Sequence, residues 1–202
     1  MESRRSCSSA MTRWGDALLK ACALPGRYGS ALILILVLVV LAAVIGAQFG
    51  LSDLASWTTP IPLFGNHLNM TSIGELQWHI FSLLVMLSGA YALKEDRHVR
   101  VDVWSVRFSD RTRLIVDILG DAFFLIPFFA LLAWYSWAFM AMAYGFGEQS
   151  NAGGLVDRYL VKAVLPIGSV LILMAGVGRV LRNVGLLLSA GNENAAIKGT
   201  SQ

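Results

Sequence analysis

Four long stretches without charged residues divide this sequence, and they constrain its fold more than any other feature. They cover residues 28–52, 76–93, 122–147 and 163–178. A helix rises about 1.5 Å per residue, so the roughly 30 Å hydrocarbon core of a bilayer requires about 20 residues. The first and third stretches reach that length alone. The other two reach it with flanking basic side chains, whose alkyl stems extend to the interface.

Each stretch is expected to form a helix, because backbone groups in hydrocarbon must pair within their own segment. The predicted fold class is therefore an all-α integral membrane protein with four transmembrane helices and short interfacial helices. The predicted membrane domain covers residues 28–188, with spans over about residues 29–48, 73–93, 114–144 and 161–186. A polar tail of small residues, 189–202, is expected to be disordered.

The segment before the first span, residues 1–27, is predicted to be a cytoplasmic leader. Within it, Met11, Trp14, Leu18 and Cys22 recur at helical spacing, with charged residues between them. This pattern fits a short helix in the inner membrane interface, which Pro25-Gly26 would end. It fits an unstructured basic leader equally well.

The distribution of lysine and arginine predicts the orientation of the chain. Five precede the first stretch, none lies between the first and second, six lie between the second and third, two between the third and fourth, and three follow. Loops rich in basic residues stay in the cytoplasm, so both termini are predicted to be cytoplasmic. Because the basic residues lie at span ends, they indicate topology, and no nucleic-acid partner is expected.

The sequence offers no pattern for catalysis or for a cofactor. By the predicted topology, His67, His79 and His98 lie outside, within the second span and inside, so they cannot jointly bind a metal or a haem. A glycine-rich phosphate loop, a nucleophile elbow and metal-binding motifs are all missing from the sequence. We therefore predict no catalytic, cofactor-binding or metal-binding residues.

Three acidic residues near span ends are candidates for structural or subunit contacts. Glu75 precedes the second span, where it fits an N-terminal cap at the outer interface or a polar contact to another subunit. Asp117 and Asp121 lie four residues apart, with Arg113 one turn earlier. They fit, in order of preference, a helical extension balanced by Arg113, a contact to a partner, or a magnesium site against a lipid phosphate.

Pairs of small residues are spaced for close helix packing. Gly168 and Gly176 lie eight residues apart in the fourth span, and Ser82 and Ala90 have the same spacing in the second. Small residues let helices approach closely. These pairs fit packing within the chain and packing against a partner equally well.

The most distinctive segment follows the second span and reads His98-Val99-Arg100-Val101-Asp102. Apolar and polar residues alternate here, which predicts a short extended link, and Asp102 is placed to cap an interfacial helix carrying Trp104 and Phe108. We hypothesise that Arg100 and Asp102 hold this link against the third span or a partner subunit. The yield of purified complex after alanine replacement of both residues would test this role.

Several motifs together resemble one family. The order of Glu75, Tyr91-Ala92-Leu93 and His98-Val99-Arg100-Val101-Asp102 resembles the small membrane subunit of tripartite ATP-independent periplasmic (TRAP) transporters, the DctQ-like family. Lys162 with Pro166-Ile167-Gly168 at the fourth span is also similar to that family.

The resemblance covers roughly residues 28–188 and implies a function. Such a subunit is a multi-pass protein of the bacterial inner membrane, and it pairs with a large membrane subunit that carries the substrate and sodium sites. A periplasmic binding protein delivers an organic solute. The small subunit is similar to a scaffold and is neither an enzyme nor a cofactor-binding protein. The alternatives are a membrane anchor of a respiratory or other enzyme complex and a small membrane enzyme acting on lipid.

The predicted topology can be tested by thiol labelling. Cysteines introduced by Trp57→Cys or Ala152→Cys are expected to react with a membrane-impermeant thiol reagent applied from the periplasm, because both sites lie in predicted outer loops. Cysteines introduced by Arg97→Cys or Glu193→Cys are expected to remain unlabelled. Labelling of the Arg97→Cys variant from outside would contradict the topology.

Overall fold

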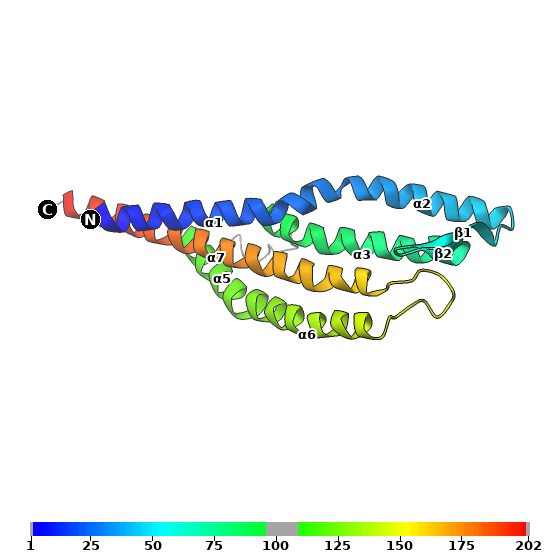
Figure 1. Cartoon of the computed structure of the whole chain (residues 1–202). Coiled ribbons are helices and arrows are strands. Elements are labelled where there is room, and N and C mark those ends of the chain that lie inside the picture. Colours follow the sequence, from blue (N-terminus) through cyan, green and yellow to red (C-terminus); the bar gives the residue numbers. More distant parts are fainter. Residues whose placement is uncertain (1, 96–108, 201–202) are drawn as a thin grey trace. The chain divides into compact units, whose positions relative to one another are not determined.

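The structure, a computed structural model of the whole chain, describes residues 2–95 and 109–200 (Figure 1). The described residues are almost entirely helical, with one small hairpin. In chain order the elements are α1 (Glu2–Gly29), α2 (Ala31–Gln48), β1 (Asp53–Ile61), β2 (Gly65–Asn69), α3 (Met70–Lys94), α5 (Asp110–Gly120), η1 (Asp121–Leu125), α6 (Ile126–Gly145) and α7 (Tyr159–Thr200).

Four helical stretches in the described residues are long and apolar enough to cross a membrane. They are Ser8–Gln48, Met70–Lys94, Asp110–Gly145 and Tyr159–Ser189. The predicted all-α membrane class is confirmed. Three of these stretches are at least 31 residues long, more than a bilayer requires, because the helices continue past their apolar parts into polar sequence. Ser109 caps the start of α5, where its side chain accepts a hydrogen bond from the Thr112 N–H.

The chain divides into two compact units, and helices α1, α3, α6 and α7 contribute residues to both. Unit 1 comprises the described parts of Met1–Leu24, Ala90–Ala130 and Val170–Gln202. Unit 2 comprises Pro25–Gly89 and Leu131–Ser169. Unit 1 thus contains the described residues at both ends of the chain. Unit 2 contains the two connections that the sequence predicts to be outside, one between α2 and α3 and the other between α6 and α7.

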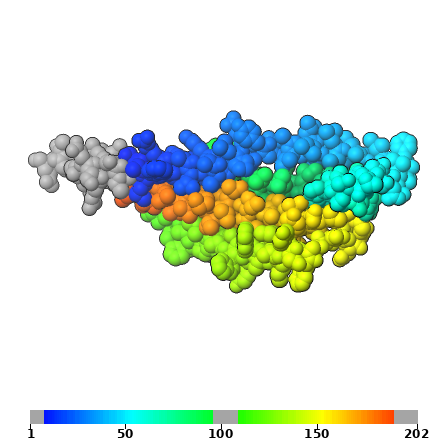
Figure 2. Space-filling model, in the orientation of Figure 1, coloured from blue at the N-terminus to red at the C-terminus, as the bar shows by residue number. Residues whose placement is uncertain are grey.

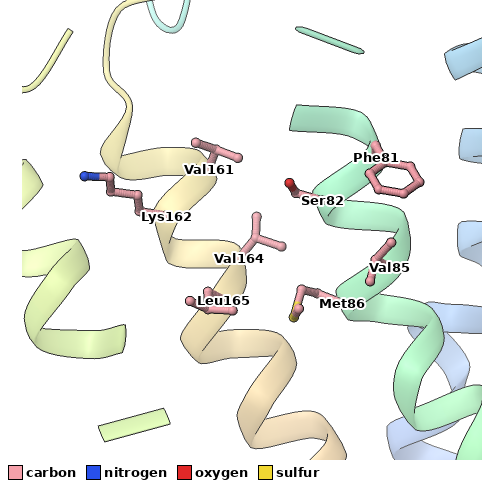
Figure 3. A pocket seen from close by; sticks show the side chains of 8 residues that line it. All are labelled: Phe81, Ser82, Val85, Met86, Val161, Lys162, Val164 and Leu165. Carbon is pink, nitrogen blue, oxygen red and sulfur yellow. The ribbon is translucent and has the colours of Figure 1, made fainter. Parts of the chain in front are cut away.

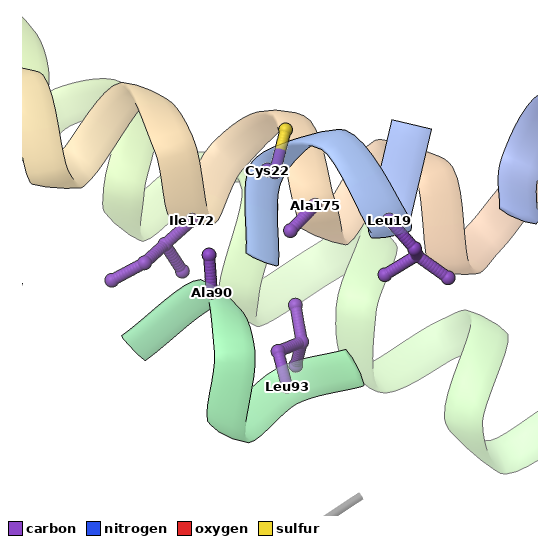
Figure 4. Packing of buried hydrophobic residues seen from close by; sticks show 6 residues of the cluster. All are labelled: Leu19, Cys22, Ala90, Leu93, Ile172 and Ala175. Atoms are coloured by element: carbon purple, nitrogen blue, oxygen red, sulfur yellow. The ribbon is translucent and has the colours of Figure 1, made fainter. Parts of the chain in front are cut away.

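The core of unit 1 joins three helices (Figure 4). Leu19 from α1, Leu93 from the end of α3 and Ala175 from α7 are almost completely buried against one another. Cys22 lies in the same cluster, and the structure shows it as a free thiol. Leader residues are therefore part of a packed core.

Helix α1 contacts α7 through small residues, and the two helices run side by side in Figure 1. A Cβ atom added at Gly15 would lie 2.6 Å from the Gly178 carbonyl oxygen, which leaves room only for glycine. Farther along, the Ser8 hydroxyl donates to the Gly185 carbonyl at 2.7 Å. Backbones that approach this closely pack with many van der Waals contacts.

The structure corrects the prediction for the leader in two respects. Its buried face is centred on Gly15 and Leu19, whereas Trp14, which was expected on the apolar face, is 71% exposed. The helix also continues through Pro25 to Gly29. A proline within a helix removes one backbone hydrogen bond, and the packed residues before it keep the helix in place.

The end of the chain also differs from the predicted disordered tail. Helix α7 extends through residues 189–200 to Thr200. These residues include no proline, so nothing in them interrupts a helix that has already formed.

In unit 2 the connection between α2 and α3, which the sequence predicts to be an outer loop, is a β-hairpin. Strands β1 and β2 pair antiparallel, with Ser56 opposite His67 and Ile61 opposite Gly65. The Trp57 indole N–H donates to the Gly65 carbonyl at 2.6 Å, which ties the two strands at their turn. Pro60 is compatible with this pairing because each strand of a two-stranded sheet has a free edge.

The close contact between α1 and α7 gives a prediction for Gly15. Gly15→Ala is expected to lower the free energy of unfolding by about 1–3 kcal/mol, because the added methyl group meets the α7 backbone. The matched control is Gly120→Ala in α5, where nothing lies within 4 Å of an added Cβ. The control is expected to be neutral or stabilising by about 0.5–1 kcal/mol. Thermal unfolding in detergent measures both, and equal effects would contradict the packing.

Candidate functional site

The described residues contain no group of three or more histidine, cysteine, aspartate or glutamate side chains that could hold a metal ion. The polar side chains gather instead near the ends of the spans. Their arrangement determines whether they serve binding or packing.

In unit 1, a buried ion pair joins the third and fourth spans. The Arg179 guanidinium donates through Nε and Nη2 to the two carboxylate oxygens of Asp121. The side chain of Asp121 is 3% exposed and that of Arg179 is 14% exposed. This bidentate geometry is the strongest form of an arginine–carboxylate contact. It also orients the two helices, because both hydrogen bonds have to be made together.

The structure therefore corrects the expected partner of Asp121, which is Arg179 and not Arg113. Arg113 lies exposed on α5. The sequence contained a signal for the true pair. The third and fourth spans are consecutive and antiparallel by the predicted topology, so the acidic residue that begins one and the basic residue that ends the other lie at the same depth.

Asp121 also begins the π-helical segment η1, a wider turn of five residues between α5 and α6. Short π-helical segments inside α-helices are frequent at functional sites. At this segment the Leu125 side chain lies directly over Gly176 of α7, so close that no Cβ would fit. Together, the ion pair and the contact between Leu125 and Gly176 hold the third and fourth spans close to each other at this point.

A more exposed pair lies beside the buried one. Arg182 Nε is 3.2 Å from Asp16 Oδ1, and the two side chains are 43% and 46% exposed. Between this pair and α5 is a hollow of about 380 Å³. Its polar lining has charges of both signs and comprises Lys94, Glu95, Asp117, Arg179, Arg182 and Asn183. Such a mixed lining suits a polar packing network better than a site for a single anion.

In unit 2, Glu75 is bound by the connection between α6 and α7. The Ser150 hydroxyl donates to Glu75 Oε1, and the Leu155 N–H donates to Oε2 at 2.8 Å. Glu75 lies one turn inside α3, which begins at Met70. It is therefore not the predicted N-terminal cap, and the partners of its carboxylate are in its own chain.

Further hydrogen bonds tie this connection to the hairpin, and Figure 2 shows the two segments, cyan and yellow, in contact. The Asn69 amide donates to the Gly153 carbonyl at 2.8 Å. The Val156 N–H donates to the Leu63 carbonyl at 2.9 Å. Both outer connections consequently form one structure around Glu75.

An apolar hollow of about 310 Å³ lies between α3 and α7 in the same unit (Figure 3). Val164 and Leu165 of α7 face Val85 and Met86 of α3 across it. Lys162 points away from the space and pairs with Glu148. Ser82 is then the one uncharged polar side chain of the lining, so the hollow lacks the groups that would recognise an organic anion.

The small residues singled out in the sequence pack within the chain. A Cβ added at Gly168 would lie 2.6 Å from that of Met86 on α3, Gly176 contacts Leu125, and Ala90 is in the unit 1 core. Of the remaining candidates, Asp117 is half-buried and lines the polar hollow. His98, Arg100 and Asp102 lie outside the described residues, so their role stays a prediction.

Comparison with known proteins identifies one family. A family model described as "Tripartite ATP-independent periplasmic transporters, DctQ component" matches residues 36–185. Comparisons with curated proteins and with solved structures found no significant match.

The buried ion pair gives a prediction with a matched control. Asp121→Asn is expected to lower the free energy of unfolding by about 3–5 kcal/mol, because it removes the charge that Arg179 pairs with in a buried position. Asp16→Asn, in the exposed pair, is expected to cost about 0–1 kcal/mol. Thermal unfolding of the purified protein in detergent measures both. Equal losses would show that burial does not set the strength of the pair.

Proposed function

Because the chain belongs to the DctQ component family of tripartite ATP-independent periplasmic transporters, we infer that it scaffolds the large membrane subunit of such a transporter. The family is a transporter component and not an enzyme family. In this proposal the large subunit carries the solute and sodium sites, and a periplasmic binding protein delivers the organic solute.

The observation that carries the proposal is the contrast between wide apolar faces and satisfied polar groups. In the most apolar part of the first and third spans only 6% of residues are buried, against 33% in the fourth. The first and third spans thus offer most of their surface to lipid or to another protein. Arg179, Lys162 and Glu75 are meanwhile paired within the chain.

Electrostatics supports placing the solute site elsewhere. An organic anion entering the bilayer needs donors or cations to replace its hydration. The carboxylate of Glu75 would repel an anion, and the cationic side chains of Arg179 and Lys162 are paired with Asp121 and Glu148. A scaffold needs none of these groups to be available.

We also propose that the chain is located in the inner membrane with both termini in the cytoplasm. The arrangement of the units supports this orientation. The described residues of both terminal segments, the end of α3 and all of α5 belong to unit 1, whereas the hairpin and the connection between α6 and α7 belong to unit 2. The basic residues outside the spans are concentrated in the segments assigned to unit 1.

Reconstitution tests the proposal. Proteoliposomes containing this chain alone are expected to take up no solute. Uptake is expected only when the large subunit, the binding protein and a sodium gradient are supplied together with this chain, and omitting the chain should reduce or abolish it. The measurement is accumulation of labelled solute, with a collapsed sodium gradient as control. Sodium-driven uptake by the chain alone would contradict the scaffold role.

A further inference from the structure

The polar hollow of unit 1 contains a buried amide that lacks a partner. Asn183 of α7 lines this hollow, which has a volume of about 380 Å³. The residue is only 7% exposed, and within residues 2–95 and 109–200 its side chain makes no hydrogen bond. An amide removed from water without a partner raises the free energy of the folded chain. A ligand that accepts a hydrogen bond from this amide would therefore be stabilised in the hollow.

Two cationic side chains of the same lining carry more N–H groups than their contacts use. Lys94 donates one of its three N–H groups to Glu95 at 3.0 Å. Arg182 directs Nε toward Asp16 at 3.2 Å, and its two terminal nitrogens carry four further N–H groups. Together with the Asn183 amide, these side chains form a set of donors that suits the oxygens of a phosphate group.

Carboxylates in the lining add a second requirement. Glu95 and Asp117 border the same hollow, and they would repel a ligand that carried negative charge alone. A carboxylate offers about four lone-pair positions, so each can accept from a ligand while it keeps its contacts within the chain. A ligand that joins a phosphate to an ammonium group matches the donors and the carboxylates together.

The hollow lies at headgroup depth in the orientation proposed above. Asp121 marks the inner end of the apolar part of the third span, and Asp117 lies four residues before it, about 6 Å along the helix. The headgroup layer adds roughly 5–8 Å on each side of the hydrocarbon core. Leu114 and Leu186 also line the hollow, so apolar surface adjoins the charged side chains, as an amphipathic ligand requires.

We propose that this hollow binds the headgroup of an inner-leaflet phospholipid whose phosphate carries a primary ammonium group, as in phosphatidylethanolamine. Asn183, Arg182 and Lys94 donate to the phosphate oxygens. Glu95 and Asp117 accept from the ammonium group. Basic pockets between spans on the cytoplasmic side are sites for lipid headgroups, and the carboxylates here select for an amine. The inference rests on the proposed orientation and is independent of the transport role.

Two other occupants match the lining less well. Inorganic phosphate would lie beside Glu95 and Asp117 with no positive group of its own to offset the repulsion. Water can satisfy the Asn183 amide, but the hollow has the volume of about twelve water molecules. Its leucines offer those molecules no hydrogen bonds. A lipid headgroup places its polar atoms against the charged side chains and its glycerol end against the leucines.

Native mass spectrometry of the delipidated full chain in detergent measures binding of one phospholipid at a time. Phosphatidylethanolamine is expected to bind with a Kd about tenfold or more below those of phosphatidylglycerol and phosphatidylcholine with the same acyl chains. The first competitor lacks an ammonium group, and the ammonium of the second has no N–H to donate. Soluble phosphoethanolamine and inorganic phosphate are expected to bind more weakly than the lipid by a similar factor, because neither has an apolar part.

Variants locate the site. Asn183→Leu keeps a side chain of similar size and removes the amide, so the Kd for phosphatidylethanolamine is expected to rise about tenfold. Without lipid its melting temperature is expected to equal or exceed that of the unaltered chain, because an unpartnered buried amide is lost. Arg182→Ala is expected to weaken binding similarly. Its matched control, Arg113→Ala, removes an exposed arginine outside the hollow and should change the Kd less than about twofold.

Each outcome decides one part of the inference. Equal binding of phosphatidylethanolamine and phosphatidylglycerol would show that the ammonium group is not recognised. An unchanged Kd for Asn183→Leu, with the variant folded, would place the lipid elsewhere and overturn the site. Phosphoethanolamine binding as tightly as the lipid would make the ligand a soluble one. None of these results touches the scaffold role, which reconstituted uptake tests separately, and loss of the scaffold role would leave lipid binding intact.

Discussion

The absence of water from the bilayer core is the constraint on which the rest of this structure depends. Backbone groups there must pair within a helix, and every polar side chain needs a partner from protein. The described spans obey this rule at their ends. Asp121 is bound by Arg179 near one end of the third span, and Glu75 is bound by Ser150 and the Leu155 N–H near the start of the second. At these two places the chain itself supplies the partners of its carboxylates.

The two units meet this constraint by different means. Unit 1 uses a bidentate ion pair and close helix packing. The pair joins Asp121 to Arg179, and glycines such as Gly15 and Gly176 let neighbouring helices pack closely. Unit 2 uses connections: the α6–α7 loop and the hairpin close around one carboxylate. Both solutions restrict how neighbouring helices can rotate or slide. The scaffold role proposed above requires such restriction, because a flexible scaffold would absorb the motion it is meant to oppose.

The sequence predicts the number, type and approximate extent of the spans, because apolar length is a local property. It did not identify Arg179 as the partner of Asp121, or Gly15 as the centre of the α1 face, because both depend on which helix lies opposite. The hairpin was missed for a related reason, since Pro60 argues against a strand unless the strand has a free edge.

Buried ion pairs rarely add much stability over a hydrophobic contact of equal size, because desolvation offsets their attraction. In this chain the buried ion pair mainly sets the orientation of the helices that it joins. An aliphatic surface such as that of α2 packs almost equally well in several rotations, whereas Arg179 can bind both oxygens of Asp121 in only one. Within unit 1, η1 continues into the first turn of α6 as one helix, so fixing Asp121 fixes the rotation of these turns about the helix axis. That rotation directs Leu125 toward Gly176 of α7. The buried pair thus determines which side chains the start of this span presents to α7.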